Sequence, residues 1–259
     1  MRTVLVLAFL TPLILSIILK AQSNPNSVTI LFDNYVSNPD SKSGWGFSCI
    51  VDFKGNKVLF DAGGDEIVFA SNVTALDVDI SDINCVVFSH EHGDHTAALN
   101  YILNVKENLK VYVPASFSTE FENRVKEKSG ELIRVKSSLE LCKGIYLTGE
   151  MGDEIKEQSM ILDTEKGLII ITGCSHPGIV SIINKAKVIL DKEIYMVIGG
   201  FHLGQYSSSA IKEIIEQFNK LGVKKCGATH CTGETQIQMF REAFGSNFIE
   251  LGTGKKIEL

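Results

Sequence analysis

The stretch Ser89-His90-Glu91-His92-Gly93-Asp94-His95 is the most informative part of this chain. It holds three of the chain's six histidines. The other three, His176, His202 and His230, each follow an apolar run further along the sequence. Because no histidine is left over for an ordinary surface or core position, the pattern indicates a site for two metal ions.

The apolar run at residues 84–88 leads directly into this stretch and predicts a strand buried on both faces. Ligands that follow such a strand stand on a rigid edge of the sheet. His90 and His92 are two residues apart, so in extended chain their side chains point the same way. We therefore expect both to face one metal position.

The second half of the stretch is expected to face a second position. Gly93 permits the chain to turn, which brings Asp94 and His95 to a point a few ångströms from the first pair. Imidazole and carboxylate ligands together suit Zn²⁺, with Mn²⁺ or Fe²⁺ as alternatives. One short segment thus predicts two ligands for each of two divalent ions.

Further ligands are expected where later strands turn into helices. His176 follows a predicted strand at residues 167–172, and His230 follows one at residues 223–229. Both are predicted ligands, although His176 has an alternative role as the N-cap of the next helix. His202 has three possible roles, as a ligand, as a partner of a ligand or as a donor to the substrate, and we favour the last two.

The chain has six cysteines, of which two adjoin the predicted site. Cys174 and Cys231 are candidate ligands, a candidate disulfide pair, or neither. Cys85 lies inside the apolar run at residues 84–88, so we expect a buried free thiol.

The remaining periodicity predicts strands alternating with helices in one domain over residues 27–259. This pattern favours sheets with helices packed outside them. Further strands are expected at residues 28–32, 47–53, 57–60, 109–113, 132–135, 144–147, 159–162 and 193–198, and helices at 96–104, 117–125, 179–189, 211–218 and through 240–244.

The N-terminus has the pattern of a secretory signal. Arg2 precedes an apolar run at residues 4–19, and Ala21-Gln22-Ser23 fits the rule of small residues at a cleavage site. We expect residues 1–23 to be a signal peptide, with the mature chain secreted or extracytoplasmic. The alternative is membrane anchoring by residues 4–19, a run slightly short of the usual span of about 20 residues.

Composition excludes one class of partner. The 259 residues are 44% apolar and carry a net charge of −6, so a large core is expected and a clustered basic face is not. Binding to nucleic acid through phosphate neutralisation needs such a face. The expected partner is a small-molecule substrate, with a membrane involved only if the N-terminal segment stays uncleaved. The sequence does not predict an oligomeric state.

These motifs together resemble the metallo-β-lactamase superfamily over nearly all of residues 27–259. The resemblance rests on the His-x-His-x-Asp-His run, on the turn Leu59-Phe60-Asp61-Ala62-Gly63, and on the later histidines. Three segments resemble one subgroup of metal-dependent hydrolases that includes proteins like the dihydropterin–ribofuranosylaminobenzene phosphate synthase: Gly173-Cys174-Ser175-His176-Pro177-Gly178, Gly199-Gly200-Phe201-His202-Leu203 and Thr229-His230-Cys231-Thr232-Gly233.

The resemblance implies an α/β fold of the four-layer αββα type, with a two-metal site at one edge of the sheets. It assigns His90, His92 and His176 to one ion, and Asp94, His95 and His230 to the other. Many relatives carry a metal-bridging Asp after a strand, where this chain has Gly173-Cys174. Cys174 is therefore a candidate ligand in the place of that carboxylate.

Three functions remain open from the sequence. The first is an exported hydrolase in which Asp94 orients the attacking water and His202 donates to the substrate. The second is a transferase acting on a phosphorylated, pterin-like substrate, which requires a basic pocket that Lys224, Lys225 or Arg124 would have to reach. The third is a non-catalytic metal-binding protein.

The loop at residues 34–46 is a candidate wall of the substrate pocket. Trp45 and Phe47 are the residues expected to line it, although an exposed loop with one tucked aromatic side chain explains the pattern equally well.

Overall fold

The computed structural model describes residues 26–259. The predicted signal peptide or anchor at residues 1–23 lies outside the described residues. Within residues 26–259, no helix combines the length and the apolar character that crossing a membrane requires.

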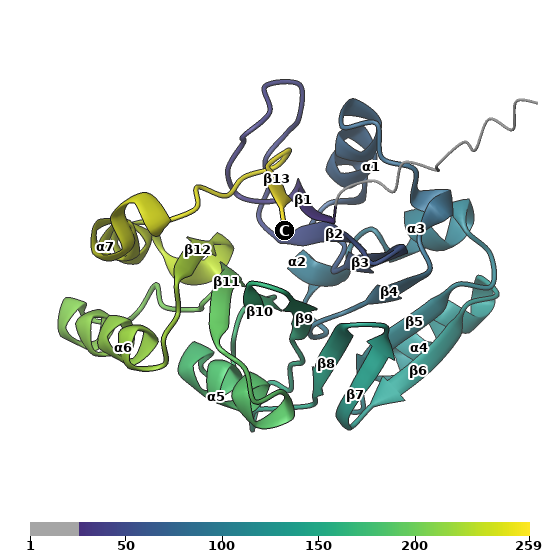
Figure 1. Cartoon of the computed structure of the whole chain (residues 1–259). Helices are drawn as coiled ribbons and strands as arrows, with labels where there is room; N and C mark the ends of the chain where they lie inside the picture. The colour runs from purple at the N-terminus through teal and green to yellow at the C-terminus, as the bar shows by residue number, and fades with distance from the viewer. Residues whose placement is uncertain (1–25) are drawn as a thin grey trace, which may run out of the picture.

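Two mixed sheets lie face to face at the centre of the molecule (Figure 1). The first has seven strands in the order β13-β1-β2-β3-β4-β5-β6. Their bounds are β1 Ser27–Phe32, β2 Ser48–Phe53, β3 Asn56–Phe60, β4 Cys85–Val87, β5 Lys110–Pro114, β6 Glu131–Val135 and β13 Lys256–Glu258. The second has six strands in the order β12-β11-β10-β9-β8-β7. Their bounds are β7 Ser137–Cys142, β8 Ile145–Gly149, β9 Met160–Thr164, β10 Gly167–Thr172, β11 Ile194–Gly200 and β12 Lys225–Thr229.

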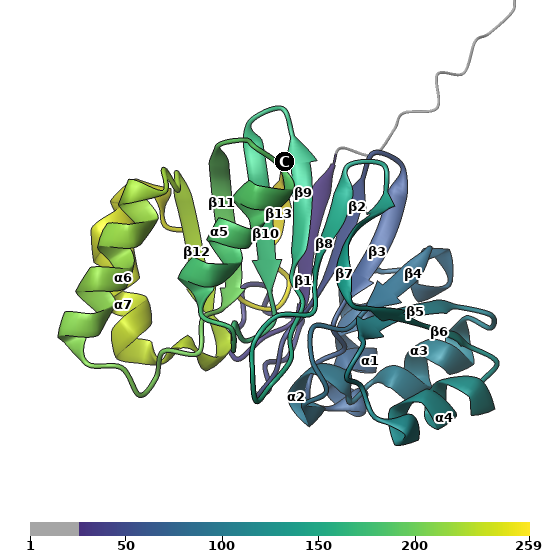
Figure 2. The same ribbon diagram turned by 90° about the horizontal axis from the view of Figure 1, so that it is seen from below.

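Helices cover the outer face of each sheet (Figure 2). Those beside the first sheet are α1 Glu66–Ala75, α2 Gly93–Thr96, α3 Leu99–Val105 and α4 Thr119–Glu127. Those beside the second sheet are α5 Ile179–Ile189, α6 Ser208–Lys220 and α7 Glu234–Phe244. Three short 3₁₀ turns complete the chain: η1 Ile80–Asp82, η2 His230–Thr232 and η3 Gly245–Asn247.

The buried apolar side chains form three clusters, one between each pair of layers. The central cluster joins the inner faces of the sheets and includes Val51 and Ile169. A second joins the first sheet to its helices through residues such as Phe69, and a third joins the other sheet to α5, α6 and α7 through residues such as Phe218. Three interfaces between four layers confirm the predicted αββα sandwich in one domain.

Most predicted elements are present, but three were missed. Helix α1 was missed because its apolar residues are adjacent in the sequence and lack helical spacing. One of them, Ile67, is 80% exposed. Strand β7 is an edge strand with a partly polar sequence, and β13 has only three residues. The single helix predicted at residues 96–104 is divided into α2 and α3.

The role predicted for Gly93 is wrong. This residue begins α2, has no positive φ, and a Cβ built on it meets nothing within 4 Å. The chain turns after His92 because a helix begins there, so Asp94 and His95 are carried by the first turn of a helix and not by a glycine-dependent loop.

Candidate metal centre

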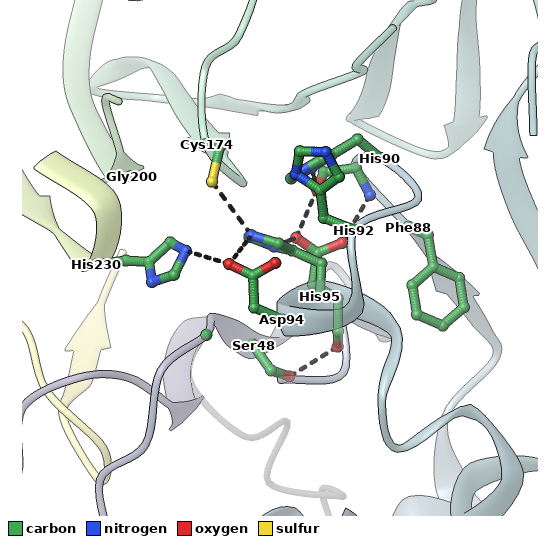
Figure 3. Close-up of polar contacts among 12 residues, drawn as sticks. Ser48, Phe88, His90, His92, Asp94, His95, Cys174, Gly200 and His230 are labelled. Carbon is green, nitrogen blue, oxygen red and sulfur yellow. Dashed lines mark hydrogen bonds and ion pairs between the residues drawn. The ribbon is translucent and has the colours of Figure 1, made fainter. Parts of the chain in front are cut away.

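Segments from both sheets bring the predicted ligands together. The segment that follows β4 carries His90 to His95, and β10, β11 and β12 lead to Cys174, His202 and His230. Strands β10, β11 and β12 are parallel, so their carboxyl ends lie at one edge of the second sheet. Figure 3 shows Cys174 directed at His95 and His230 directed at Asp94, so three separate parts of the chain meet here.

One set of possible ligands contains Asp94, His95, Cys174 and His230. One ligand atom from each of the four lies within 4.8 Å of the others. The Nε2 atom of His95 lies 3.3 Å from Cys174 Sγ and 3.7 Å from Asp94 Oδ2. The Nε2 atom of His230 lies 3.3 Å from the same Asp94 oxygen. This set contains the three residues assigned to the second ion, together with the candidate Cys174.

A second set contains His90, Cys174 and His176. His92 lies beside this set, with its Nδ1 atom 3.1 Å from His90 Nε2 and its ring centroid 5.1 Å from that of His176. His92 is exposed and is the N-cap residue of α2. Cys174 belongs to both sets, so it lies between the two predicted metal positions.

The hydrogen bonds of the histidines leave metal-binding nitrogens free. His95 Nδ1 bonds Asp61 at 2.8 Å, and His230 Nδ1 bonds the side-chain oxygen of Asn34 at 3.0 Å. Each ring then presents Nε2 to the centre, which is how neighbouring groups orient metal-binding imidazoles. The buried Nε2 atom of His176 has no hydrogen-bond partner, and that of His230 faces the Asp94 carboxylate at 3.3 Å. Divalent ions would satisfy these nitrogens, so the donor set fits the predicted metals.

The charges around the centre favour the protonation states that ligands need. Burial and the neighbouring histidines hold the pKa of His90 well below its usual value, so this ring stays neutral. Burial by itself raises the pKa of Asp94, but the hydrogen bond and charge of His230 and the charge of His95 outweigh it and leave the pKa well below the usual range. Asp94 is therefore ionised.

His202 and Cys231 form a third group with Cys174. The ring centroid of His202 lies 4.3 Å from that of His176, and its backbone has a φ of 52°. A hydrogen bond with Cys174 and a weaker one with His202 outweigh the effect of burial and lower the pKa of the Cys231 thiol. All six cysteines are free thiols in the structure, so Cys174 and Cys231 do not form the disulfide that was one alternative. Cys85 is buried, as predicted.

Sequence reasoning missed the residue that shapes the segment around Cys174 and His176. The buried side chain of Glu157 accepts hydrogen bonds from the backbone N–H groups of Cys174, Ser175 and His176, at 3.0, 2.8 and 2.8 Å. Burial raises its pKa to about 7. Nothing in the sequence around Glu157 marks it, because its partners lie 17 to 19 residues away. The N-cap of α5 is Gly178, so His176 does not have the capping role that was its alternative.

A cavity of about 540 Å³ opens beside His202, His230 and Cys231. Trp45 lines it as predicted, but the prediction for Phe47 is wrong. Phe47 is fully buried in the core between the sheets, because it directly precedes β2 and packs between the sheets as that strand does. The remaining lining residues are Asn34, Tyr35, Gly204, Gln205, Tyr206, Gly233 and Glu234.

The lining residues of this cavity include no Lys or Arg. The side chain of Lys225 lies over Tyr195, near the start of β12 and at the opposite end of that strand from His230. The backbone N–H of Lys224 donates a hydrogen bond to the carbonyl of Ile194. The guanidinium group of Arg124 lies over the ring of Phe121, in the helix layer outside the first sheet. The transferase alternative needed Lys224, Lys225 or Arg124 in the pocket, and none of these three residues lines this cavity.

Comparison with known proteins decides the family. The model of the metallo-beta-lactamase superfamily matches residues 46–190. A synthase of Methanocaldococcus jannaschii, the 7,8-dihydropterin-6-methyl-4-(beta-D-ribofuranosyl)-aminobenzene-5'-phosphate synthase, is 31% identical over 82% of this chain and 89% of its own length. The chain belongs to the metallo-beta-lactamase superfamily.

Solved structures of this superfamily share the fold over most of the chain. Tm1679, described as a metal-dependent hydrolase of the beta-lactamase superfamily, has a TM-score of 0.78 and 28% identity, covering 90% of this chain and 99% of its own. The metallo-beta-lactamase fold protein YhfI from Bacillus subtilis has a TM-score of 0.68 and 16% identity, covering 91% of this chain and all of its own.

Proposed function

We propose that this protein is a metal-dependent hydrolase with a dinuclear, zinc-type site that acts on an ester, lactone or phosphoester bond. The observation that carries the proposal is a pair of buried imidazole nitrogens: His176 Nε2, which has no hydrogen-bond partner, and His230 Nε2, which faces the Asp94 carboxylate at 3.3 Å. They belong to two ligand sets that share Cys174. The likeness to Tm1679 supports hydrolysis as the reaction class.

Each ion has a set of residues that would hold it. The first set is His90, His92 and His176, the second is Asp94, His95 and His230, and Cys174 lies where it can serve both. When bound, divalent ions lower the pKa of coordinated water toward about 7 and stabilise the negative charge that develops in the transition state.

The side chains supply orientation and proton transfer. Asp94 is half-buried and ionised, so it would help to hold an ion and align the attacking water. His202 is exposed on the cavity side, next to His176, and would donate to the substrate or to its developing oxyanion.

The test is hydrolysis of a panel of esters, lactones and phosphodiesters by metal-loaded protein and by Asp94→Ala. We expect Asp94→Ala to lose at least about 100-fold in kcat/KM, as for other residues that act directly on the reacting groups, with an unchanged circular dichroism spectrum. Asp191→Ala is the matched control, because Asp191 is an exposed carboxylate that follows α5. Retained hydrolysis by Asp94→Ala would contradict the assigned role.

A synthase is the second candidate, and the 31% identity to the Methanocaldococcus jannaschii enzyme favours it. The name of that enzyme includes a ribofuranosyl phosphate, and proteins commonly bind phosphate groups through Lys or Arg side chains. The cavity beside His230 is lined by Glu234 and by no Lys or Arg, which favours the hydrolase. Calorimetry with ribose 5-phosphate separates the two candidates. If the protein is the hydrolase, we expect no heat of binding. Binding to the metal-loaded protein that becomes tighter in Glu234→Gln would favour the synthase.

We also propose that the chain is exported, on the evidence of the pattern in residues 1–23. N-terminal sequencing of protein secreted by an expressing bacterium should give a start near Asn24. Recovery of the full chain in the membrane fraction would favour the anchor at residues 4–19.

A further inference from the structure

Three aromatic side chains are exposed around one cavity. Tyr35, Trp45 and Tyr206 are 36%, 63% and 49% exposed, and they are the aromatic residues among the exposed large apolar side chains of residues 26–259. All three line the cavity beside His202 and His230. Exposed aromatic rings that gather at one concave site mark a binding surface.

The backbone that carries Trp45 is fixed to the metal centre. Gly46 N–H donates to the side chain of Asn34 at 3.2 Å, and Phe47 N–H donates to the carbonyl of Asp94 at 3.3 Å. A Cβ on Gly46 would lie 2.4 Å from that same carbonyl oxygen, so only glycine permits this approach. The indole nevertheless remains exposed, with its ring centroid 5.0 Å from that of His230. A rigid backbone with an exposed ring is preorganised to receive a ligand.

The segment that carries Tyr206 is fixed in a similar way. Tyr206 N–H donates to the carbonyl of Leu203 at 2.8 Å, and its own carbonyl accepts from Gln236 Nε2 at 3.1 Å. Gln236 is buried on α7, so this wall of the cavity is tied to a helix of the outer layer.

The charge of the cavity limits the ligand. Its lining carries one carboxylate, Glu234, and no Lys or Arg. Away from His202 and His230, the lining offers no cationic side chain to an anionic group, and a neutral ring meets three aromatic side chains.

We propose that this cavity binds an uncharged, planar aromatic ring of the substrate, packed against Trp45, Tyr35 and Tyr206 beside His230. The inference rests on the proposed function, because the bond to be hydrolysed would lie at the metal ligands next to this ring. Ring binding itself needs no metal, so it is tested separately from hydrolysis.

The experiment compares 2-naphthol with its saturated counterpart, decahydro-2-naphthol, in binding to metal-free protein. Trp45 is the chain's one tryptophan, so its indole N–H gives a single resonance in a ¹H–¹⁵N spectrum. We expect 2-naphthol to shift that resonance and to bind at least fivefold more tightly than the saturated compound by calorimetry. Trp45→Ala and Tyr206→Ala should each weaken 2-naphthol binding by about 2- to 10-fold or more, the loss expected for one aromatic pair. Trp45→Phe should retain most of it.

The control is Val188→Ala, because Val188 is 81% exposed on α5 and does not line the cavity. Equal binding of the two compounds, or affinity for 2-naphthol that is unchanged in Trp45→Ala and Tyr206→Ala, would overturn the proposal. Either result leaves the metal content and the hydrolase assignment standing. Conversely, a protein that binds the ring selectively but hydrolyses no compound of the panel would overturn the proposed function and keep this inference.

Discussion

Asp61 orients a predicted metal ligand, His95, although the two residues lie far apart in the sequence. This fully buried carboxylate bonds His95 Nδ1 at 2.8 Å and also accepts from the backbone N–H and the hydroxyl of Ser89, at 2.6 and 2.7 Å. It therefore fixes the ring of one predicted ligand and the start of the segment that carries the others. Carboxylates behind metal-binding histidines commonly have this role.

Asp61→Asn should weaken metal binding at the second position by about 10- to 100-fold, because it removes the charge behind His95 and keeps the size of the side chain. The measurement is zinc affinity by competition with a chromophoric chelator. Asp65→Asn is the matched control, since Asp65 caps α1 away from the centre. Equal zinc affinity in Asp61→Asn and in the unaltered protein would contradict this role.

The buried carboxyl group of Asp33 should make the free energy of unfolding depend on pH. Burial raises its pKa from 3.8 to about 7, although hydrogen bonds from Thr229 and Tyr35 oppose the shift. Between these values the folded chain keeps a proton that the unfolded chain has released, so the free energy of unfolding falls as pH rises from about 4 to about 7.

Asp33→Asn removes this titration. Relative to the unaltered protein, its free energy of unfolding should rise between pH 4.5 and pH 8 by about 3 kcal/mol, because about 2.5 pH units of this range lie below the folded pKa of about 7, at 1.36 kcal/mol per unit. Urea unfolding at the two pH values checks the difference between the two proteins. Parallel pH dependences would show that Asp33 is ionised throughout this range.

At the scale of elements, the loop after β10 depends on Glu157, which stands just before β9. Glu157→Gln keeps one carbonyl oxygen but places an amide N–H₂ against one of the backbone N–H donors. At pH 8 this variant should lose about 1.5–3 kcal/mol of stability, the range for a hydrogen bond to a charged group. It should also bind less metal, because Cys174 and His176 lose their fixed positions.

Chemical denaturation and metal analysis check this prediction, with exposed Glu154→Gln as the matched control. Full stability together with full metal content in Glu157→Gln would contradict the positioning role.

The elements that sequence predicted well are those whose pattern is local. Strand β10 at Gly167–Thr172 is a pure apolar run and was predicted with its observed bounds. Gly222, with a φ of 78°, follows α6 where the end of a helix was expected. Helix α1 was missed because its burial is set by packing on the first sheet, which local spacing does not reveal.

The same distinction holds for the centre. The histidines and Asp94 stand in conspicuous motifs and were identified, and the structure brings them together with Cys174. The groups behind them were not identified, because Glu157 and Asn34 contact the predicted ligand segments only through the tertiary fold. Their contacts span many residues and leave no spacing to recognise.

At the scale of the whole molecule, each of the two sheets supplies a different part of the candidate metal centre. The first sheet supplies His90, His92, Asp94 and His95 after β4, and the second supplies the remaining candidates after β10, β11 and β12. The core between the sheets therefore sets the distance between the two halves of each ligand set. Cys174, which belongs to both sets, lies at the point where the halves meet.

The most direct test of the central claim is the metal content of the folded protein. The chain is purified without chelator, reconstituted with zinc, and analysed by inductively coupled plasma mass spectrometry against protein concentration. The account predicts two ions per chain, falling to about one in His230→Ala, which removes a ligand of one set. One ion or none in the unaltered, reconstituted protein would contradict a dinuclear centre.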